Sequence, residues 1–239
     1  MRPVPGMANS EEKLLALLSG QYLESKQSKS TQGLDFVSVL KFVLILSPIY
    51  GMAMGGFAWV AGYKSLGTHW PQMVYSALKM PILLLVTVAI ALPAFFVFNS
   101  LAGLRDDFLD AMHAILLSLA TFSLAIVTLA PFTLLFYYSM PQLKESYRVA
   151  VLFNAMVFAI ASCAAQISLL RGYQVLIARR ANHRQMLWVW LFLFALVGIQ
   201  FGWTLRPFIG NPFQETTFFR EESFTSAYLQ LIRIIRSLL

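Results

Sequence analysis

The residues that could do chemistry are few in this chain, and they form no catalytic pattern. There are three histidines and one cysteine among 239 residues. No HExxH, CxxC, GxSxG or phosphate-binding glycine motif occurs in the sequence. A histidine-built metal site therefore has too few candidate ligands. We expect no catalytic residue, no metal ligand and no cofactor site, and hence a protein that is not an enzyme.

The sharpest charged motif is the segment Leu104–Asp110 (LRDDFLD), which has three acids and one arginine. Two interpretations of this segment stay open. Its carboxylates could bind a divalent ion or a partner, or they could form a solvated turn that caps the positive end of the following helix. The capped turn is the simpler interpretation, because it needs no ligand.

Neutral amides supply the polar groups inside the apolar stretches of the chain. They are Asn99, Asn154, Gln166 and Gln200. An amide inside a membrane can form a hydrogen bond between helices, at about 1 kcal/mol each, or it can contact a substrate. We favour hydrogen bonds between helices, because the centres of these stretches carry no ionisable group that would mark a transport pathway.

Small residues recur at four-residue spacing, which places them on one face of a helix and lets two backbones approach closely. The positions are Gly51 and Gly55, Gly198 and Gly202, and Ala155, Ala159 and Cys163. We expect these residues to pack helices. The pattern does not distinguish packing inside one bundle from packing against another subunit, and both stay open.

Composition determines the kind of fold that must position these groups. Hydrophobic residues make up 58% of the chain and charged residues 12%, against roughly 45–50% and 25% in soluble domains. The mean hydropathy is +0.67. Such a chain cannot cover its apolar surface with polar groups, which excludes the soluble globular and disordered classes. We predict an all-α, polytopic membrane protein.

Five uncharged stretches are each long enough to cross about 30 Å of hydrocarbon as a helix. They run over about residues 42–63, 80–104, 111–140, 149–170 and 185–205. Pro93 and Pro131 are expected to kink or end the second and third helices. Lys41 and Lys79 stand at the beginnings of spans, where a long side chain can reach the membrane surface. The prediction is a bundle of five transmembrane helices.

Polar segments flank these spans and divide the chain into three parts. Residues 1–35 form a polar cytoplasmic tail with a short amphipathic helix. Residues 36–206 form the transmembrane domain, which ends where Arg206-Pro207 stops the fifth helix. Residues 207–239 form a tail on the outer face, with a second amphipathic helix from about Thr225.

An odd number of spans places the two termini on opposite sides of the membrane. The densest basic cluster, Arg179, Arg180 and Arg184, lies between the fourth and fifth spans. The positive-inside rule makes this loop cytoplasmic, with the N-terminus inside and the C-terminus outside. We expect these arginines, together with Arg233 and Arg236, to meet lipid headgroups or a partner. Although the net charge is +7, nucleic acid is not an expected partner, because the basic residues are scattered.

Two segments carry a family resemblance. One is Ala77-Leu78-Lys79-Met80-Pro81 with Leu92-Pro93 and Val97-Phe98-Asn99, and the other is Gly202-Trp203-Thr204-Leu205-Arg206-Pro207-Phe208-Ile209-Gly210. With its polar N-terminus and five spans, the chain from about Phe36 onward resembles the Yip1-like integral membrane proteins, and among them an uncharacterised bacterial set. The resemblance implies a bacterial inner membrane. It also implies a role in organising membranes, which is the role of the eukaryotic members.

Two hypotheses for function follow from these features. The first is a non-enzymatic inner-membrane protein that serves as a subunit or organiser of a larger assembly, in contact with membrane lipids and with other membrane subunits, identical or different. The second is a small transporter or channel, in which neutral solutes or lipid pass between helices near Pro93, Asn99 and Pro131. A membrane enzyme acting on lipid ranks last, because the chain lacks an acid, base and nucleophile set.

Overall fold

The computed structural model of the protein describes residues 36–63, 70–141, 144–220 and 229. Every regular element in this part of the chain is helical. The elements are α3 (Phe36–Gly55), α4 (Phe57–Val60), α5 (Trp70–Leu101), the 3-10 helix η1 (Arg105–Asp107), α6 (Phe108–Thr128), α7 (Ala130–Tyr138), α8 (Lys144–Arg179) and α9 (His183–Thr204). Five stretches of these residues are long and apolar enough to cross a membrane, with η1, α6 and α7 forming one of them. The predicted all-α bundle with five spans is confirmed.

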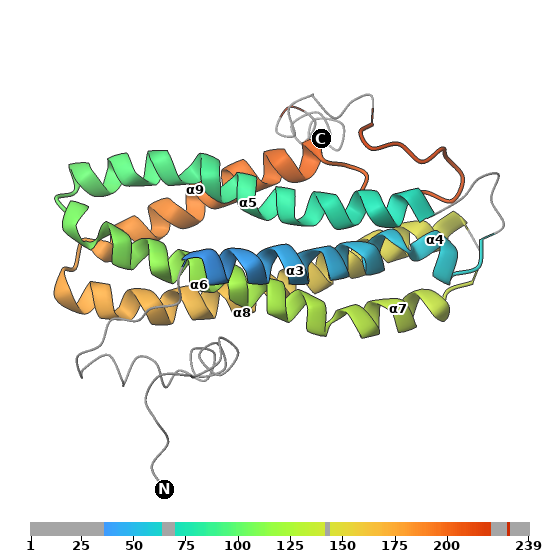
Figure 1. The fold of residues 1–239 in the computed structure, drawn as a ribbon, viewed down its shortest axis with the longest axis horizontal. Coiled ribbons are helices and arrows are strands. Elements are labelled where there is room, and N and C mark those ends of the chain that lie inside the picture. Colours follow the sequence, from blue (N-terminus) through green and yellow to red (C-terminus); the bar gives the residue numbers. More distant parts are fainter. Residues whose placement is uncertain (1–35, 64–69, 142–143, 221–228, 230–239) are drawn as a thin grey trace, which may run out of the picture.

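The long helices run along the long axis of the molecule (Figure 1). Helix α3 packs against both α5 and α6, while α9 packs on α5 and α8 packs on α6. Helices α8 and α9 are consecutive in the chain, yet they contact each other much less than they contact these neighbours. The bundle is therefore well packed along the series α9, α5, α3, α6 and α8, and loosely packed where α8 meets α9.

Glycine allows α3 and α5 to approach closely. A Cβ atom added at Gly51 would lie 2.8 Å from the Cα of Ala77, and one added at Gly55 would lie 2.6 Å from the carbonyl oxygen of Gln72. Real Cβ atoms do not come this close to backbone atoms, so a larger residue would push the helices apart. The GxxxG pattern of the first span thus lies against a helix of the same chain.

The two prolines that were expected to kink or end a helix, Pro93 and Pro131, act differently. Pro131 lies in the first turn of α7, and the third span divides at Leu129 into α6 and α7. Pro93 lies inside α5, which continues beyond it to Leu101. A helix in a membrane tolerates an internal proline when its neighbours and local adjustments satisfy the freed backbone groups.

Helix α5 begins at Trp70 and not at about Met80, so Lys79 lies inside it. The side chain of Lys79 is 0% exposed. The expectation that this lysine reaches the membrane surface is therefore wrong. The physical reason is a contact between Lys79 and the segment that follows α9, which supplies a hydrogen-bond acceptor inside the protein.

Several sequence predictions fall on residues that the structure does not describe. They are the amphipathic helix within residues 1–35, the helix from about Thr225 apart from Leu229, and the arginines Arg233 and Arg236. These stay predictions. So do the division of the chain into three parts and the sidedness of its termini.

Candidate functional site

The bundle has two ends with different polar chemistry. We name one the Asp107 end; it holds η1 and the turn between α8 and α9. We name the other the Arg206 end; it holds the last turn of α9, residues 205–220 and the beginnings of α5 and α8. A groove between α8 and α9 reaches this second end.

The α8–α9 groove has a volume of about 760 Å³, within the range of about 300–1,000 Å³ that is typical of ligand sites. In the bundle it is lined by Met54 of α3, Leu83 of α5, Val151, Leu152, Asn154, Ala155 and Phe158 of α8, and Gly198 and Gly202 of α9. Most of these side chains are apolar. The groove extends from the exposed Leu152 to Met54, which is 2% exposed, so it connects the outer surface with the interior.

Small residues of α8 and α9 leave this space open. A Cβ atom added at Gly198 would make an ordinary contact, 3.6 Å from Cγ2 of Thr87, and one added at Gly202 would meet no atom of the described chain within 4 Å. On α8, Ala155, Ala159 and Cys163 are all exposed. Ala155, Gly198 and Gly202 therefore line the groove, whereas Ala159 and Cys163 lie on the exposed surface of α8 outside its lining. The glycines of α3 differ from both groups, because they lie against a neighbouring helix.

A hydrogen-bonded cluster around Asn154 forms the floor of the groove. Tyr50 Oη donates to Asn154 Oδ1 at 2.8 Å, and Asn154 Nδ2 donates both to Tyr137 Oη and to the carbonyl of Ala150, the latter at 2.7 Å. Asn154 is 3% exposed, and its partners come from α3, α7 and its own helix. The amide is satisfied inside the protein, so it does not require a polar ligand in the groove.

The other three predicted amides have different surroundings. Asn99 Nδ2 donates to the carbonyl of Phe95 in its own helix at 2.9 Å, while its Oδ1 is buried without a partner among the described residues. Gln166 is exposed, and Gln200 is partly buried on α9. The expected hydrogen bond between helices is thus observed at Asn154, whereas Asn99 donates within its own helix and Gln166 lies on the surface.

Three polar side chains of α5 hold the backbone that follows α9. We name Gln72, Ser76 and Lys79, which lie about one turn apart on one helix face, the α5 clasp. Gln72 Nε2 donates to the carbonyls of Pro207 and Phe208 at 3.1 and 3.0 Å. Ser76 Oγ donates to Phe208, and Lys79 Nζ donates to Pro207 at 2.8 Å. These donors satisfy carbonyls in a segment that forms neither helix nor sheet.

Aromatic rings complete the surroundings of Lys79. Its Nζ lies 4.7 Å from the ring centroid of Phe218 and 6.0 Å from that of Phe208. Among the described residues, no carboxylate oxygen lies within 4 Å of this ammonium group. The face of an aromatic ring attracts a cation. The Lys79 ammonium group is therefore held by neutral groups, namely these two rings and the Pro207 carbonyl. The structure thereby brings together the two segments on which the family resemblance rests.

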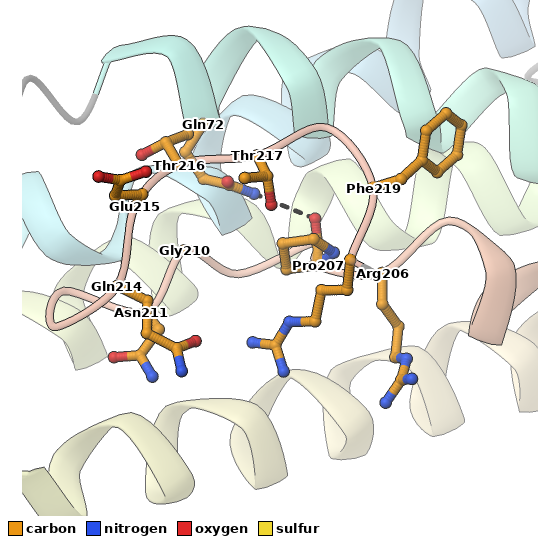
Figure 2. Close-up of a pocket in the computed structure, with 11 residues that line it drawn as sticks. Gln72, Arg206, Pro207, Gly210, Asn211, Gln214, Glu215, Thr216, Thr217 and Phe219 are labelled. Carbon is orange, nitrogen blue, oxygen red and sulfur yellow. Dashed lines mark hydrogen bonds between the residues drawn. The ribbon is translucent and has the colours of Figure 1, made fainter. Parts of the chain in front are cut away.

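A smaller pocket of about 400 Å³ lies along the same segment, and its lining is largely polar (Figure 2). Figure 2 shows the Gln72 amide reaching Pro207 from α5, whereas the Arg206 side chain extends away from α5. Arg206 and Pro207 line both this pocket and the α8–α9 groove. The segment that the clasp holds therefore separates a polar pocket from an apolar groove.

Three arginines line the groove at the Arg206 end: Arg148, Arg206 and Arg220. The guanidinium carbon of Arg206 lies 3.2 Å from the ring centroid of Trp203, and its Nε donates to the Trp203 carbonyl at 3.2 Å. Arg220 Nη2 lies 3.5 Å from Tyr147 Oη. Sequence reasoning did not assign Arg148 or Arg220 to a site. Their shared position along the groove depends on how residues 205–220 pack on the bundle. The sequence predicts the end of α9 at Arg206-Pro207 but not the surface on which the following segment packs.

The Asp107 end is organised around carboxylates. Arg179 contacts Asp110 at 2.7 Å and Asp107 at 3.7 Å. Arg180 and the fully buried His183 contact Asp107 at 3.7 and 3.2 Å. Asp107 stands at the N-cap of α6 without a side-chain cap hydrogen bond. Its carboxylate instead contacts Arg179, Arg180 and the His183 ring. Ion pairs between segments thus replace the capping that we expected of the LRDDFLD motif.

The three arginines that were expected to meet lipid headgroups have different surroundings: Arg179 and Arg180 contact carboxylates, and Arg184 lies on the surface. The side chains of Arg179 and Arg180 are 47% and 49% exposed while they contact these acids, and Arg184 is exposed. Exposed ion pairs are weak, so the contacts do not prevent the two paired arginines from also meeting lipid.

The groove can hold an apolar chain along its length and a polar group beside its arginines. Along α8 the lining runs from Tyr147 to Phe158, about 16 Å of helix. Comparison of the chain with protein-family models, with curated proteins and with solved structures finds no match.

Proposed function

We propose that this chain is a non-enzymatic integral membrane protein that binds a membrane lipid, with one acyl chain in the α8–α9 groove. The observation that carries the proposal is an apolar groove of about 760 Å³ between two candidate spans. Its lining includes Val151 and Leu152, which are exposed on the outside of the bundle. An acyl chain can therefore enter sideways from the bilayer.

The dimensions and chemistry of the groove favour a lipid over a polar solute. Its length along α8, about 16 Å, corresponds to one leaflet of a hydrocarbon core that is about 30 Å thick. The amide of Asn154 has its partners inside the protein, so the floor offers few hydrogen bonds to a solute. An acyl chain makes no such demand and gains contacts with Leu83 and Phe158.

Groove-filling substitutions test the proposal by the lipid that stays bound to the full-length protein after extraction in a mild detergent. Gly202→Leu and Ala155→Leu place side chains in the groove, and the open space at Gly202 keeps strain low. Ala159→Leu is the matched control, because Ala159 is exposed on α8 outside the groove lining. Native mass spectrometry counts the lipid.

We expect about one retained lipid in the wild type and in the control, and about fivefold less in the groove variants, which corresponds to about 1 kcal/mol. A wild type without retained lipid would contradict the proposal. Equal retention in all four proteins would contradict it as well.

Membership of a larger membrane assembly is a second proposal, and the exposed small residues of α8 favour it. Ala155, Ala159 and Cys163 would let another helix approach closely. Cys163 is the single cysteine of the chain, so oxidation in native membranes reports contact between two copies. A disulfide-linked dimer would support assembly through α8. A chain that never cross-links and migrates alone at 26.9 kDa would count against it.

The Yip1-like resemblance, the inner membrane and the cytoplasmic N-terminus stay proposals of the same kind. Contact between Lys79 and Pro207 supports treating the two resembling segments as one structural unit. Reporter fusions at the two termini test the sidedness: the proposal requires opposite compartments. If the protein instead transports lipid, labelled lipid should move between the leaflets of a reconstituted vesicle. This movement is measured independently of the amount of lipid that stays bound after extraction.

A further inference from the structure

We infer that the lipid of the α8–α9 groove is an anionic phospholipid, and that Arg148, Arg206 and Arg220 bind its phosphate. This inference rests on the proposed function and adds the chemical class of the ligand. Arg148 comes from the beginning of α8, and Arg206 and Arg220 come from the segment after α9. All three line one groove, whose described lining contains no carboxylate. Glu145 contacts Arg148, and Glu215 lines the adjoining polar pocket together with Arg206 and Arg220. The groove therefore combines an apolar cavity with three guanidinium groups along its lining.

Arginine is well suited to a phosphate at this position. Its planar guanidinium group donates two parallel hydrogen bonds to phosphate oxygens, which a lysine cannot reproduce. Stacking on Trp203 at 3.2 Å sets the plane of the Arg206 guanidinium. The contact with Tyr147 Oη at 3.5 Å positions Arg220 next to the beginning of α8. Two of the three groups are thus oriented by their neighbours before a ligand arrives.

Arg148 is held less firmly than the other two. It pairs with Glu145 at 3.2 Å, and the two side chains are 79% and 73% exposed. An exposed pair of this kind contributes little, because solvent and salt screen it. A phosphate that also meets Arg206 and Arg220 can displace the Glu145 carboxylate.

The depth of the groove matches a phospholipid better than a free anion. Arg148 and Phe158 lie on the same helix, about 15 Å apart along its axis. This distance is about half of a hydrocarbon core of about 30 Å, so a phosphate at Arg148 places an acyl chain along one leaflet. Trp203 and Tyr147 lie at the same level as the arginines, where aromatic residues with a polar atom favour the membrane interface.

Competition between two lipids tests the charge requirement. The full-length protein in mild detergent is given equal amounts of phosphatidylglycerol and phosphatidylcholine with identical acyl chains, and native mass spectrometry measures each retained lipid. We expect about a tenfold preference for phosphatidylglycerol in the wild type. Combined Arg148→Gln, Arg206→Gln and Arg220→Gln substitutions should reduce this preference to about one. Arg171→Gln, an exposed α8 position outside the groove lining, is the control and should keep it.

A second measurement needs no variant and so does not depend on the fold of the triple substitution. Raising NaCl from about 0.1 to 1 M shortens the Debye length from about 10 to 3 Å. Retention of phosphatidylglycerol by the wild type should then fall several-fold, while retention of phosphatidylcholine should change little.

The outcomes separate this inference from the proposed function. Equal retention of the two lipids by the wild type overturns the inference and leaves the acyl-chain groove standing. A preference that survives in the triple variant, or that Arg171→Gln also abolishes, overturns the assignment to these arginines. A wild type that retains neither lipid overturns both proposals.

Discussion

The Asp107 end and the Arg206 end of the bundle stabilise their cations in different ways. At the Asp107 end, one carboxylate lies within 4 Å of Arg179, Arg180 and His183, all of which come from α8, α9 or the turn between them. Ion pairs of Arg179 and Arg180 with Asp107 connect the α8–α9 turn to the turn before α6. The negative charges of Asp107 and Asp110 thus lie beside the positive charges of Arg179 and Arg180 at the turn between α8 and α9.

At the Arg206 end, Lys79 and Arg206 contact neutral acceptors and aromatic rings, while the exposed Arg148 pairs with Glu145. Lys79 donates to the Pro207 carbonyl and lies over two phenylalanine rings, and Arg206 stacks on Trp203. The two ends therefore differ in the structural elements that their polar contacts connect. An ion-paired turn joins two spans, whereas the clasp holds an irregular segment in place beside an open groove with arginines along its lining.

The largest expected effect comes from the close approach of α3 and α5 beneath the clasp. Gly55→Leu would force a side chain against the carbonyl of Gln72, 2.6 Å from the position of its Cβ. We expect a loss of about 3 kcal/mol or more in the free energy of unfolding, because the backbone cannot move without opening the clasp. Denaturant titration of the purified protein, followed by tryptophan fluorescence, measures it.

Gly202→Leu is the control for this substitution, since nothing in the described chain lies within 4 Å of its added Cβ. It should change stability by less than about 1 kcal/mol. Equal losses in the two variants would show that the spacing of α3 and α5 does not depend on Gly55.

The next effect tests the Asp107 end. Asp107→Asn removes the charge that contacts Arg179, Arg180 and His183 while it keeps the size of the side chain. We expect a loss of about 2 kcal/mol, because Asp107 is 16% exposed and its partners lose the negative charge that they share. Asp106→Asn is the neighbouring control and is exposed, so it should have almost no effect. If the two substitutions cost the same, the ion pairs do not stabilise this end.

A smaller effect is expected at the clasp itself. Gln72→Ala removes the donor shared by the carbonyls of Pro207 and Phe208, at a cost of about 1 kcal/mol. The change should be local, so hydrogen exchange should increase in residues 208–212 and not in α8. Gln214→Ala, an exposed position in the same segment, serves as the control. Unchanged exchange in the Gln72 variant would mean that other contacts hold the segment.

The smallest expected effect on stability comes from the exposed ion pair between Glu145 and Arg148 beside the groove. Glu145→Gln breaks the exposed ion pair with Arg148, so stability should change by less than about 1 kcal/mol. Arg148 then no longer has a competing carboxylate at 3.2 Å. We expect the preference for phosphatidylglycerol to increase by about twofold in the lipid competition. A decrease would show that Glu145 positions Arg148 for the headgroup.

Sequence reasoning predicted the fold well, because the apolar runs that cross a membrane are local features. It placed the beginning of the second span too late, since Lys79 looked like an end marker. The residue that accepts its hydrogen bond, Pro207, is 128 positions away. A lysine can lie inside a span only when such a partner exists, and local composition does not reveal one.

The groove could be predicted only in part for the same reason. Ala155, Gly198 and Gly202 were identified as small residues at helical spacing, which suggests close packing. Whether such residues face a neighbouring helix or a gap depends on how far α8 and α9 separate. Arg148 and Arg220 lie on different segments, so their position at one groove follows from the tertiary fold alone.

Photo-cross-linking tests the central claim, a lipid chain between α8 and α9, most directly. The protein is reconstituted with a phospholipid that carries a photoreactive diazirine in one acyl chain, and the adducts are located by peptide mass spectrometry. The expected adducts are concentrated at the groove-lining residues Val151, Leu152, Ala155, Phe158, Gly198 and Gly202. Adducts spread evenly over exposed apolar positions outside it, such as Ile90 and Val97 of α5, would contradict the account.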